Sequence, residues 1–229
     1  TNDEVKRLRS LSERKFRKQT GWFLAEGARI CNEAVGLGGV MHRLAFVAGR
    51  EDDQQVKRLL AGVARAKGRA LPMTTSLLRR ISRKENPQIV LGAFEQRWTD
   101  FDRVDARNHE TWVALDRVRD PGNLGTIMRS ADAVGASGLI LIGDCTDPYS
   151  VEAVRASMGA VFNTRIIACN EPVFLKFAAS WQGRIVGTAL SASVDYRKGN
   201  YDKPLIMLMG NEQSGLTDNL IRACSQLIK

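Results

Sequence analysis

Side chains able to bind or transform a ligand concentrate in glycine-containing segments of the second half of the sequence. Asn123, Gly125 and Arg129 lie in one such segment, and Glu212 lies in another, Gly210-Asn211-Glu212-Gln213-Ser214-Gly215-Leu216. A guanidinium can clamp a phosphate or stabilise a developing oxyanion, and a carboxylate can accept a proton. Glycines let the backbone approach a ligand closely. These segments therefore predict a ligand site built from several loops.

The helix expected after Asn123 would carry Arg129 on its polar face. Leu124, Ile127, Met128 and Ala131 form one apolar face, whereas Gly125, Arg129 and Asp132 lie along the other. Gly125, one turn before Arg129, would leave room for a ligand. The simpler alternative is a surface ion pair of Arg129 with Asp132, worth only about 0.3–0.5 kcal/mol.

Several other kinds of site are excluded by residues that the sequence lacks. The histidines are His42 and His109, and no two cysteines form a C-x-x-C pair, so a structural zinc site has no ligands and we expect no metal. We expect the cysteines to be small buried apolar residues. No G-x-S-x-G elbow, G-x-x-x-x-G-K-[ST] phosphate loop or G-x-G-x-x-G fingerprint is present.

The elements that position these segments alternate regularly. In the second half, apolar strands are expected over 112–115, 138–142, 164–168, 185–188 and 205–209, separated by helices over 124–134, 151–158, 173–181 and 217–224. Strands that are apolar throughout and separated by helices predict a parallel sheet covered on both faces. Ligands bind such sheets at the carboxyl ends of the strands, where Gly187-Thr188-Ala189-Leu190 and the Glu212 segment are expected to lie.

The first half predicts a smaller α/β domain. A basic helical stretch over 1–20 precedes a strand over 21–27, and helices over 28–35, 53–67 and 75–82 alternate with strands over 44–47 and 89–94. Residues 96–110 are polar and lack periodicity. We therefore predict an α/β protein with a smaller domain over 1–95, a linker over 96–110 and a second domain over 111–229. The excess of Lys and Arg in residues 1–100 makes the domain over 1–95 the expected RNA-binding domain.

The charge of the protein is concentrated in the first of these domains. The 229 residues carry a formal net charge of +9, and residues 1–100 hold 20 Lys and Arg against 11 Asp and Glu, whereas residues 101–229 hold 14 of each. Such asymmetry favours a nucleic-acid partner, although a solvated basic helix face is the ordinary alternative. The candidate RNA-binding residues are Arg9, Arg14, Lys15, Arg17 and Lys18.

Three segments, in the right order, resemble the motifs of one enzyme family. Asn123-Leu124-Gly125-Thr126-Ile127-Met128-Arg129 matches the N-x-G-x-x-x-R motif of the SpoU (TrmH-like) RNA 2′-O-ribose methyltransferases. Ala156-Ser157-Met158-Gly159-Ala160-Val161-Phe162 resembles the S-x-G-A segment of that family, and Leu208-Met209-Gly210-Asn211-Glu212-Gln213-Ser214-Gly215-Leu216 resembles its G-N-E-x-x-G-L motif. Residues 21–27 resemble the start of a substrate-binding domain that many members carry.

The resemblance implies a SPOUT-class domain, in which a parallel sheet ends in a deep C-terminal trefoil knot that holds S-adenosylmethionine. It implies a homodimer that methylates RNA, most simply ribosomal RNA, with Arg129, Asn123 and Glu212 as the catalytic residues. The implied methyl-donor contacts are Thr188, Ala189, Leu190, Leu208, Met209, Gly210, Asn211 and Gly215. A guanidinium is a poor proton acceptor, so we assign Arg129 a positional and electrostatic role and expect Glu212 to accept the proton.

One departure from the family keeps other functions open. The chain ends at Lys229, where the third family motif would begin, and we expect truncation and an incomplete knot. The alternatives are a non-catalytic RNA-binding or ribosome-assembly factor, a tRNA 2′-O-methyltransferase and a drug-resistance methylase. No apolar run reaches about 18 residues and no signal peptide is recognisable, so we expect no membrane association. We expect a cytoplasmic protein, or a mitochondrial one if the source is eukaryotic.

Overall fold

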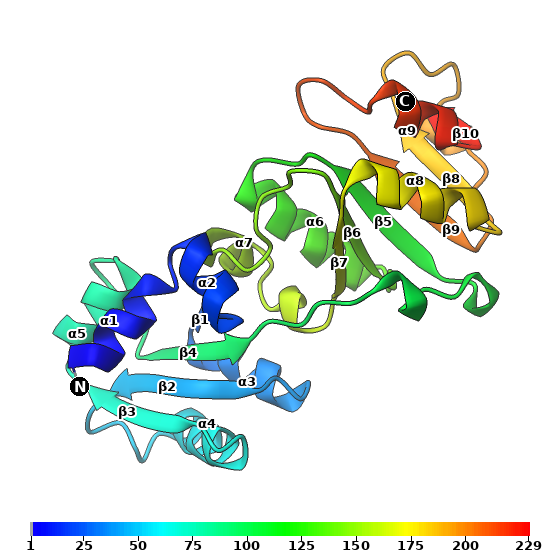
Figure 1. Cartoon of the computed structure of the whole chain (residues 1–229). Coiled ribbons are helices and arrows are strands. Elements are labelled where there is room, and N and C mark those ends of the chain that lie inside the picture. Colours follow the sequence, from blue (N-terminus) through cyan, green and yellow to red (C-terminus); the bar gives the residue numbers. More distant parts are fainter. Residues whose placement is uncertain (1) are drawn as a thin grey trace. The chain divides into compact units, whose positions relative to one another are not determined.

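The apolar runs of the second half form parallel strands, as the sequence predicts. In the computed structural model, which describes residues 2–229, these strands pair in the order β10-β8-β9-β5-β6-β7 (Figure 1). Every pair in this sheet is parallel. The strands are β5 (Thr111–Asp116), β6 (Gly138–Ile142), β7 (Arg165–Cys169), β8 (Arg184–Thr188), β9 (Leu205–Met209) and β10 (Gln226–Ile228).

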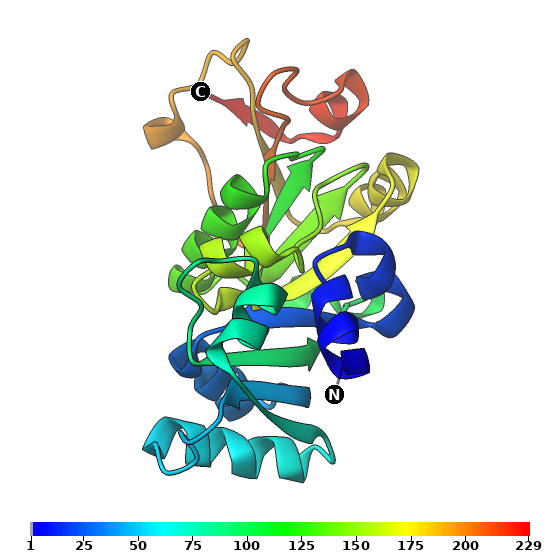
Figure 2. The same ribbon diagram turned by 90° about the vertical axis from the view of Figure 1, so that its left-hand side faces the viewer.

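Helices cover both faces of this sheet, which confirms the predicted α/β class. Trp112, Ala114, Ile140 and Ile142 share one buried cluster with Phe174 of α8 (Glu171–Ser180) and Leu220 of α9 (Asp218–Ala223). The buried residues of α6 (Pro121–Ala133) lie outside that cluster. Figure 2 shows α6 and α8 on opposite sides of the sheet. Short 3₁₀ turns complete this unit: η1 (Phe101–Arg103), η2 (Ala106–Asn108) and η4 (Tyr196–Lys198).

Helix α6 begins three residues earlier than the apolar pattern predicts. Asp120 is its N-cap, with the carboxylate accepting a hydrogen bond from the Asn123 backbone N–H at 2.6 Å, and Pro121 occupies the first turn. Asn123 therefore lies inside the helix rather than in a loop before it. The prediction that Gly125 shares the polar face is wrong, because Gly125 is buried beside Leu124 and Met128.

The first unit is built around a four-stranded sheet of order β1-β4-β2-β3. The strand pairs β1–β4 and β2–β4 are antiparallel, and β2–β3 is parallel. The strand β3 was not expected from the sequence, since Pro72 interrupts a short run. The elements are α1 (Asn2–Ser10), α2 (Arg14–Thr20), β1 (Trp22–Glu26), α3 (Ala28–Gly36), β2 (Met41–Val47), α4 (Gln54–Arg65), β3 (Arg69–Met73), α5 (Thr75–Ser82) and β4 (Val90–Glu95).

A segment from the middle of the chain packs with this first unit. Residues 2–96 and Asp147–Asn163 form one compact unit, and Arg97–Thr146 with Thr164–Lys229 form the other. Tyr149 and Phe162 pack against Phe23 of β1, with ring centroids 4.7 and 5.4 Å away. The segment includes α7 (Val151–Ala156) and η3 (Ala160–Phe162). The sequence assigns these residues to the domain over 111–229, whereas their apolar side chains are buried in the first unit.

Within residues 2–229, no helix is long and apolar enough to cross a bilayer. The same residues contain no cluster of three or more His, Cys, Asp or Glu side chains arranged to hold a metal ion.

Candidate active site at the carboxyl ends of the strands

The carboxyl ends of β5 and β9 form a switch point in the sheet. β5 is the first strand of this sheet in the chain, and it pairs with β6 on one side and with β9 on the other. The chain leaves β5 toward α6 and leaves β9 toward α9, so the two connections diverge from neighbouring strands. Crevices of this kind are the usual ligand sites of parallel sheets.

Two of the predicted catalytic residues meet at this switch point. Asn123 Nδ2 donates a hydrogen bond to Glu212 Oε1 at 3.2 Å, across 89 residues of chain. Asn211 Nδ2 donates to the other carboxylate oxygen, Glu212 Oε2, at 3.3 Å. Glu212 is exposed, yet amide donors on both sides fix the orientation of its carboxylate. The carboxylate keeps lone pairs for a further donor.

Arg129 lies further along α6 than this pair. It is exposed and follows Asn123 by six residues, which corresponds to about 9 Å along the helix axis. Within residues 2–229, its guanidinium makes no hydrogen bond or ion pair, so the alternative pairing with Asp132 does not form. Since no carboxylate of the described residues pairs with it, its positive charge is available to a phosphate or an oxyanion.

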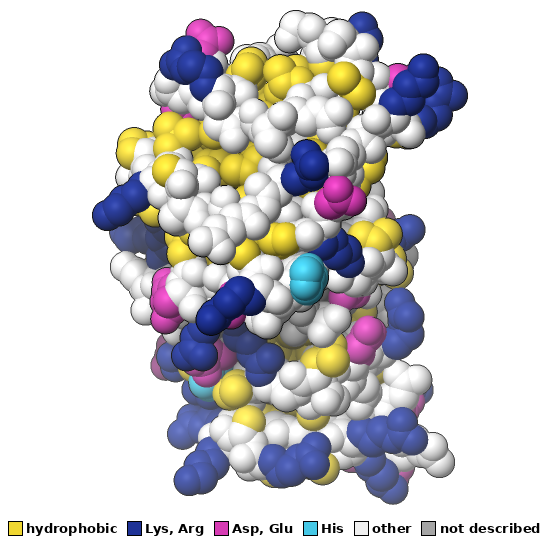
Figure 3. All heavy atoms as spheres, turned by 90° about the vertical axis from the view of Figure 1, so that its right-hand side faces the viewer, with side chains coloured by type: hydrophobic (Ala, Val, Ile, Leu, Met, Phe, Trp, Pro, Cys, Tyr) yellow, Lys and Arg dark blue, Asp and Glu magenta, His cyan; other side chains and the backbone are white. Residues whose placement is uncertain are grey.

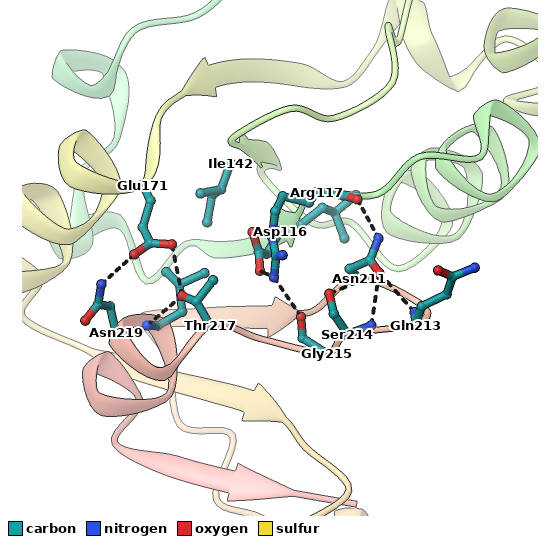
Figure 4. Close-up of polar contacts among 12 residues, drawn as sticks. Asp116, Arg117, Ile142, Glu171, Asn211, Gln213, Ser214, Gly215, Thr217 and Asn219 are labelled. Atoms are coloured by element: carbon teal, nitrogen blue, oxygen red, sulfur yellow. Dashed lines mark hydrogen bonds and ion pairs between the residues drawn. The ribbon is translucent and has the colours of Figure 1, made fainter.

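Arg117, which sequence reasoning missed, joins the two connections (Figure 4). Its Nε and Nη2 donate to both carboxylate oxygens of Asp116 at 2.9 and 2.8 Å, and Nη2 also donates to the Gly215 carbonyl at 3.1 Å. The Asn211 amide donates in turn to the Arg117 carbonyl at 2.8 Å. The one signal in the sequence that could have pointed to Arg117 was its neighbour Asp116, a carboxylate at the end of an apolar strand.

The contacts of Arg117 with Asp116 and the Gly215 carbonyl, which we call the arginine clamp, involve a strained backbone and a buried carboxylate. Arg117 has a left-handed backbone, with φ of +53°, and Asp116 is only 1% exposed. Its hydrogen bonds with Asp116 raise the pKa of the Arg117 guanidinium, so Arg117 keeps its positive charge at any ordinary pH. We infer that Arg117 positions the connection that carries Glu212.

Gly210 is required by the shape of this connection. A Cβ atom at Gly210 would lie 2.3 Å from the Gly215 carbonyl carbon and 2.4 Å from the Leu216 nitrogen. The glycine thus allows the two ends of the Asn211–Gly215 turn to approach, with Gly215 N donating to Asn211 O at 2.9 Å. A larger residue at 210 would therefore disrupt the turn itself, whether or not Gly210 contacts a ligand.

The remaining predicted donor contacts lie at the ends of the adjacent strands β8 and β9. Thr188 ends β8, Ala189 and Leu190 follow it, and Leu190 is 99% exposed. Met209 ends β9 and is half-buried, whereas Leu208 is fully buried and can offer only its backbone. Among the described residues, the backbone N–H groups of Leu190 and Gly210 have no hydrogen-bond acceptor. Two unused donors therefore lie at neighbouring strand ends.

The connection after β9 is also held at its second end, where it enters α9. Thr217, the N-cap of α9, donates through Oγ1 to Glu171 Oε2 at 2.9 Å, and Asn219 donates to Glu171 Oε1 at 2.8 Å. These bonds, drawn in Figure 4, tie α9 to the start of α8. Because Arg117 and Glu171 hold the two ends of the connection, the position of Glu212 depends on residues from three strand ends.

The predicted RNA-binding residues of the first unit divide into two groups. Arg9, Arg14, Lys15 and Lys18 are exposed on α1 and α2. The prediction is wrong for Arg17, whose side chain is 4% exposed and pairs with Asp147 at 2.7 Å. Its Nη1 also donates to the Leu11 carbonyl. In Figure 3, Lys and Arg side chains crowd the lower part of the surface, at the height of β2, β3 and α4 in Figure 1.

Family comparisons divide the chain near the predicted linker. Residues 110–229 match the model described as the SpoU rRNA Methylase family. Residues 2–92 match the model described as the MRM3-like substrate binding domain.

Individual relatives match almost the whole chain. The chain is 32% identical over 225 residues to the 23S rRNA (uridine(2479)-2′-O)-methyltransferase of Streptomyces viridochromogenes, covering 95% of this chain and 77% of that protein. The crystal structure of an AdoMet-bound rRNA methyltransferase from Sinorhizobium meliloti superposes with a TM-score of 0.93 at 42% identity, covering 99% of this chain and 85% of that one. The SpoU methyltransferase AviRb from Streptomyces viridochromogenes, in complex with AdoMet, superposes with a TM-score of 0.88 at 30% identity, covering 100% of this chain and 88% of that one.

Proposed function

The chain belongs to the SpoU rRNA methylase family, and we propose that it methylates a ribose 2′-hydroxyl of ribosomal RNA with S-adenosylmethionine as the methyl donor. The observation that supports this most is the Asn123–Glu212 hydrogen bond, which joins the first and second family motifs at the switch point of the sheet.

The residues at the ends of β8 and β9 fit the methyl donor. When bound, S-adenosylmethionine supplies an electrophilic methyl group on a sulfonium centre. The unused N–H groups of Leu190 and Gly210 are suited to acceptors on its adenosine part. We propose that Thr188, Ala189, Leu190, Leu208, Met209, Gly210, Asn211 and Gly215 line this pocket, mainly through backbone groups.

Glu212 is the proposed proton acceptor. A ribose hydroxyl is a weak nucleophile and must lose its proton as it attacks. The amides of Asn123 and Asn211 hold the Glu212 carboxylate, while Arg117 holds the segment in which it lies. The proton of the 2′-hydroxyl passes to a Glu212 oxygen as the new oxygen–carbon bond forms and the methyl–sulfur bond breaks, with S-adenosylhomocysteine as the leaving group. Neither histidine lies in a matched motif, so an imidazole base is not needed.

Arg129 supplies positive charge in the proposed mechanism. Its guanidinium clamps a phosphate beside the target ribose and stabilises the alkoxide that develops on the 2′-oxygen. Its lack of a carboxylate partner among residues 2–229 supports this role, because an existing ion pair would weaken its attraction for RNA.

We also propose the assembly implied by the family. The exposed side chains of Val134 and Leu190, 79% and 99% exposed, are suited to burial in a homodimer. A C-terminal knot is supported by β10, whose Ile228 and Lys229 carbonyls accept hydrogen bonds from Ala189 and Tyr196 in the connection after β8. The basic first unit would capture RNA, giving salt-dependent affinity.

The direct test is incubation with methyl-labelled S-adenosylmethionine and ribosomal RNA that lacks ribose methylation. We expect label in the RNA and calorimetric binding of the donor to the protein alone. RNA binding without transfer would instead identify a non-catalytic factor.

A further inference from the structure

A cavity in the first unit is not used by the proposed methyl transfer. It has a volume of about 480 Å³, within the range of small-molecule sites. All of its lining residues belong to this unit, including Ser150, Val151, Glu152, Val154 and Arg155. Its apolar lining consists of Leu24, Ile30, Ile81, Leu91, Val151 and Val154.

Of the basic side chains that line the cavity, one is paired with a carboxylate and two are not, within residues 2–229. Lys84 forms an ion pair with Glu26, and Glu26 Oε1 also accepts a hydrogen bond from the Gln88 backbone N–H at 3.1 Å. Arg83 and Arg155 line the same cavity and are exposed, and within residues 2–229 neither guanidinium has a hydrogen-bond or ion-pair partner. Glu152 is the one further carboxylate in the lining. Two unpaired guanidiniums therefore lie beside an apolar floor.

The backbone fixes the place of both arginines. Arg83 is the C-cap of α5 and has a left-handed backbone, with φ of +57°. Arg155 lies in the last turn of α7, whose Ala153 and Val154 are buried. The two guanidiniums thus come from separate ordered elements, which lowers the entropy lost when both bind one ligand.

We propose that this cavity holds one unpaired nucleotide of the RNA substrate, with the base on the apolar floor and adjoining phosphates on Arg83 and Arg155. The inference rests on the proposed function. Single-stranded RNA is recognised by seating splayed bases in pockets while cations contact the backbone. The net charge of +9 over residues 1–100 favours an anionic polymer over a neutral metabolite. The family model for substrate binding covers residues 2–92 and omits Arg155, so the proposed site extends beyond it.

The test compares matched pairs of charge removals in the full-length protein. Arg83→Gln with Arg155→Gln alters the cavity. Arg58→Gln with Arg65→Gln removes two exposed arginines of α4 in the same unit, which have no hydrogen-bond or ion-pair partner in the described part of the chain. The probe is a fluorescein-labelled single-stranded RNA of about 12 nucleotides. Anisotropy titrations between about 50 and 200 mM salt give the affinity and its salt dependence.

We expect the cavity pair to weaken binding about tenfold and to lower the salt slope by about 1.4, which corresponds to two phosphate contacts on single-stranded RNA. The α4 pair should change both quantities much less. Equal effects of the two pairs would overturn the proposal, because they would indicate a diffuse basic surface.

A third variant, Val151→Trp, tests the base contact. Filling the cavity should weaken binding about tenfold while leaving the salt slope unchanged, since no charge is removed. Thermal melting shows whether this variant folds. If it does not fold, the comparison of the cavity arginine pair with the α4 arginine pair tests the proposal. Unchanged affinity in folded Val151→Trp would contradict the proposal. These binding results do not depend on methyl transfer by the wild-type protein. An RNA-binding cavity in a protein without transferase activity, and a transferase whose cavity binds no RNA, are therefore distinguishable.

Discussion

Arg129 is the residue on which the proposed chemistry depends most. It is exposed on α6 and has no ion-pair partner within the described part of the chain. Replacing Arg129 by Ala should lower the rate of methyl transfer by at least about 10²-fold, the usual effect of removing an oxyanion-stabilising group. RNA affinity should change by only a few fold, because the basic first unit carries many other cations.

The control for Arg129 is Arg119→Ala, which removes an exposed arginine that pairs with Asp144 on the connection after β6. Single-turnover rates and RNA titrations of both variants separate the two effects. Full activity of the Arg129→Ala protein would remove Arg129 from the mechanism.

Glu212 gives a second prediction at a single position. Glu212→Gln keeps an oxygen that can accept from Asn123 but lacks a basic carboxylate. The rate should fall about 10²–10⁴-fold, the contribution of a general base, while donor affinity stays near that of the wild type. Single-turnover kinetics with a calorimetric titration of the donor measures both, and a wild-type rate in Glu212→Gln would assign the proton to another group.

The sequence identified the candidate site residues that lie in motifs, and it missed residues whose contacts depend on distant partners. Asn123 and Glu212 were identified by type and spacing, and the structure brings them together. Arg17 looked like its basic neighbours, because nothing local reveals a pairing with Asp147, 130 residues later. Arg117 was missed since its role depends on the Gly215 carbonyl, which only the folded sheet places nearby.

The connections after β5 and β9 depend on one another through Arg117. Arg117→Ala should lower the free energy of unfolding by about 3 kcal/mol, because Asp116, 1% exposed, would be left without its cation. Methyl-donor affinity should fall as well, since the Asn211–Gly215 turn loses a restraint. Arg117→Lys should restore little, because an ammonium cannot reproduce the bidentate contact and the Gly215 bond together.

A double variant separates stability from positioning. Asp116→Asn with Arg117→Ala removes the uncompensated charge, so it should recover most of the stability measured by urea unfolding. It should not recover donor affinity. Wild-type donor affinity in the double variant would mean that the clamp has only a structural role.

Element boundaries were predictable where local signals agreed. The apolar run over 205–209 is β9 as the structure has it, and the helix expected over 217–224 begins at its N-cap, Thr217. The start of α6 was missed because Pro121 and Gly122 suggested a loop, although Asp120 followed by Pro121 is also typical of a capped first turn. The strand β3 was missed since its stability comes from pairing with β2 rather than from its own residues.

Over the whole chain, buried thiols predict a loss of stability at high pH. Burial raises the pKa of Cys31 to about 12, and burial raises the pKa values of Cys169 and Cys224 to about 11 each. Well below the ordinary thiol pKa of about 9, these thiols are protonated in both the folded and unfolded states. Above it the unfolded chain releases protons that the folded protein retains, so the free energy of unfolding falls with rising pH.

Cys31 should account for up to about 4 kcal/mol of that loss between pH 9 and 12, corresponding to three pKa units. Urea unfolding across this range, with Cys31→Ala as the comparison, measures the contribution. The variant should show a shallower decline, and an identical decline in both proteins would rule out the thiol as its cause.

The division of the molecule into units was only partly accessible from the sequence. The charge asymmetry and the polar stretch over 96–110 marked two halves. The packing of Asp147–Asn163 with the first unit depends on Tyr149 and Phe162 meeting Phe23, a contact with no local signature.

The proposal that this protein is a ribose methyltransferase is tested most directly by mapping the modified nucleotide. Ribosomal RNA lacking ribose methylation is incubated with the full-length protein and S-adenosylmethionine, then partially hydrolysed in alkali. We predict that a discrete phosphodiester becomes resistant to cleavage, because a methylated 2′-oxygen cannot attack its phosphate, and that Arg129→Ala abolishes the resistance. Methyl label on a base, or a cleavage ladder unchanged by the wild-type protein, would contradict the assignment.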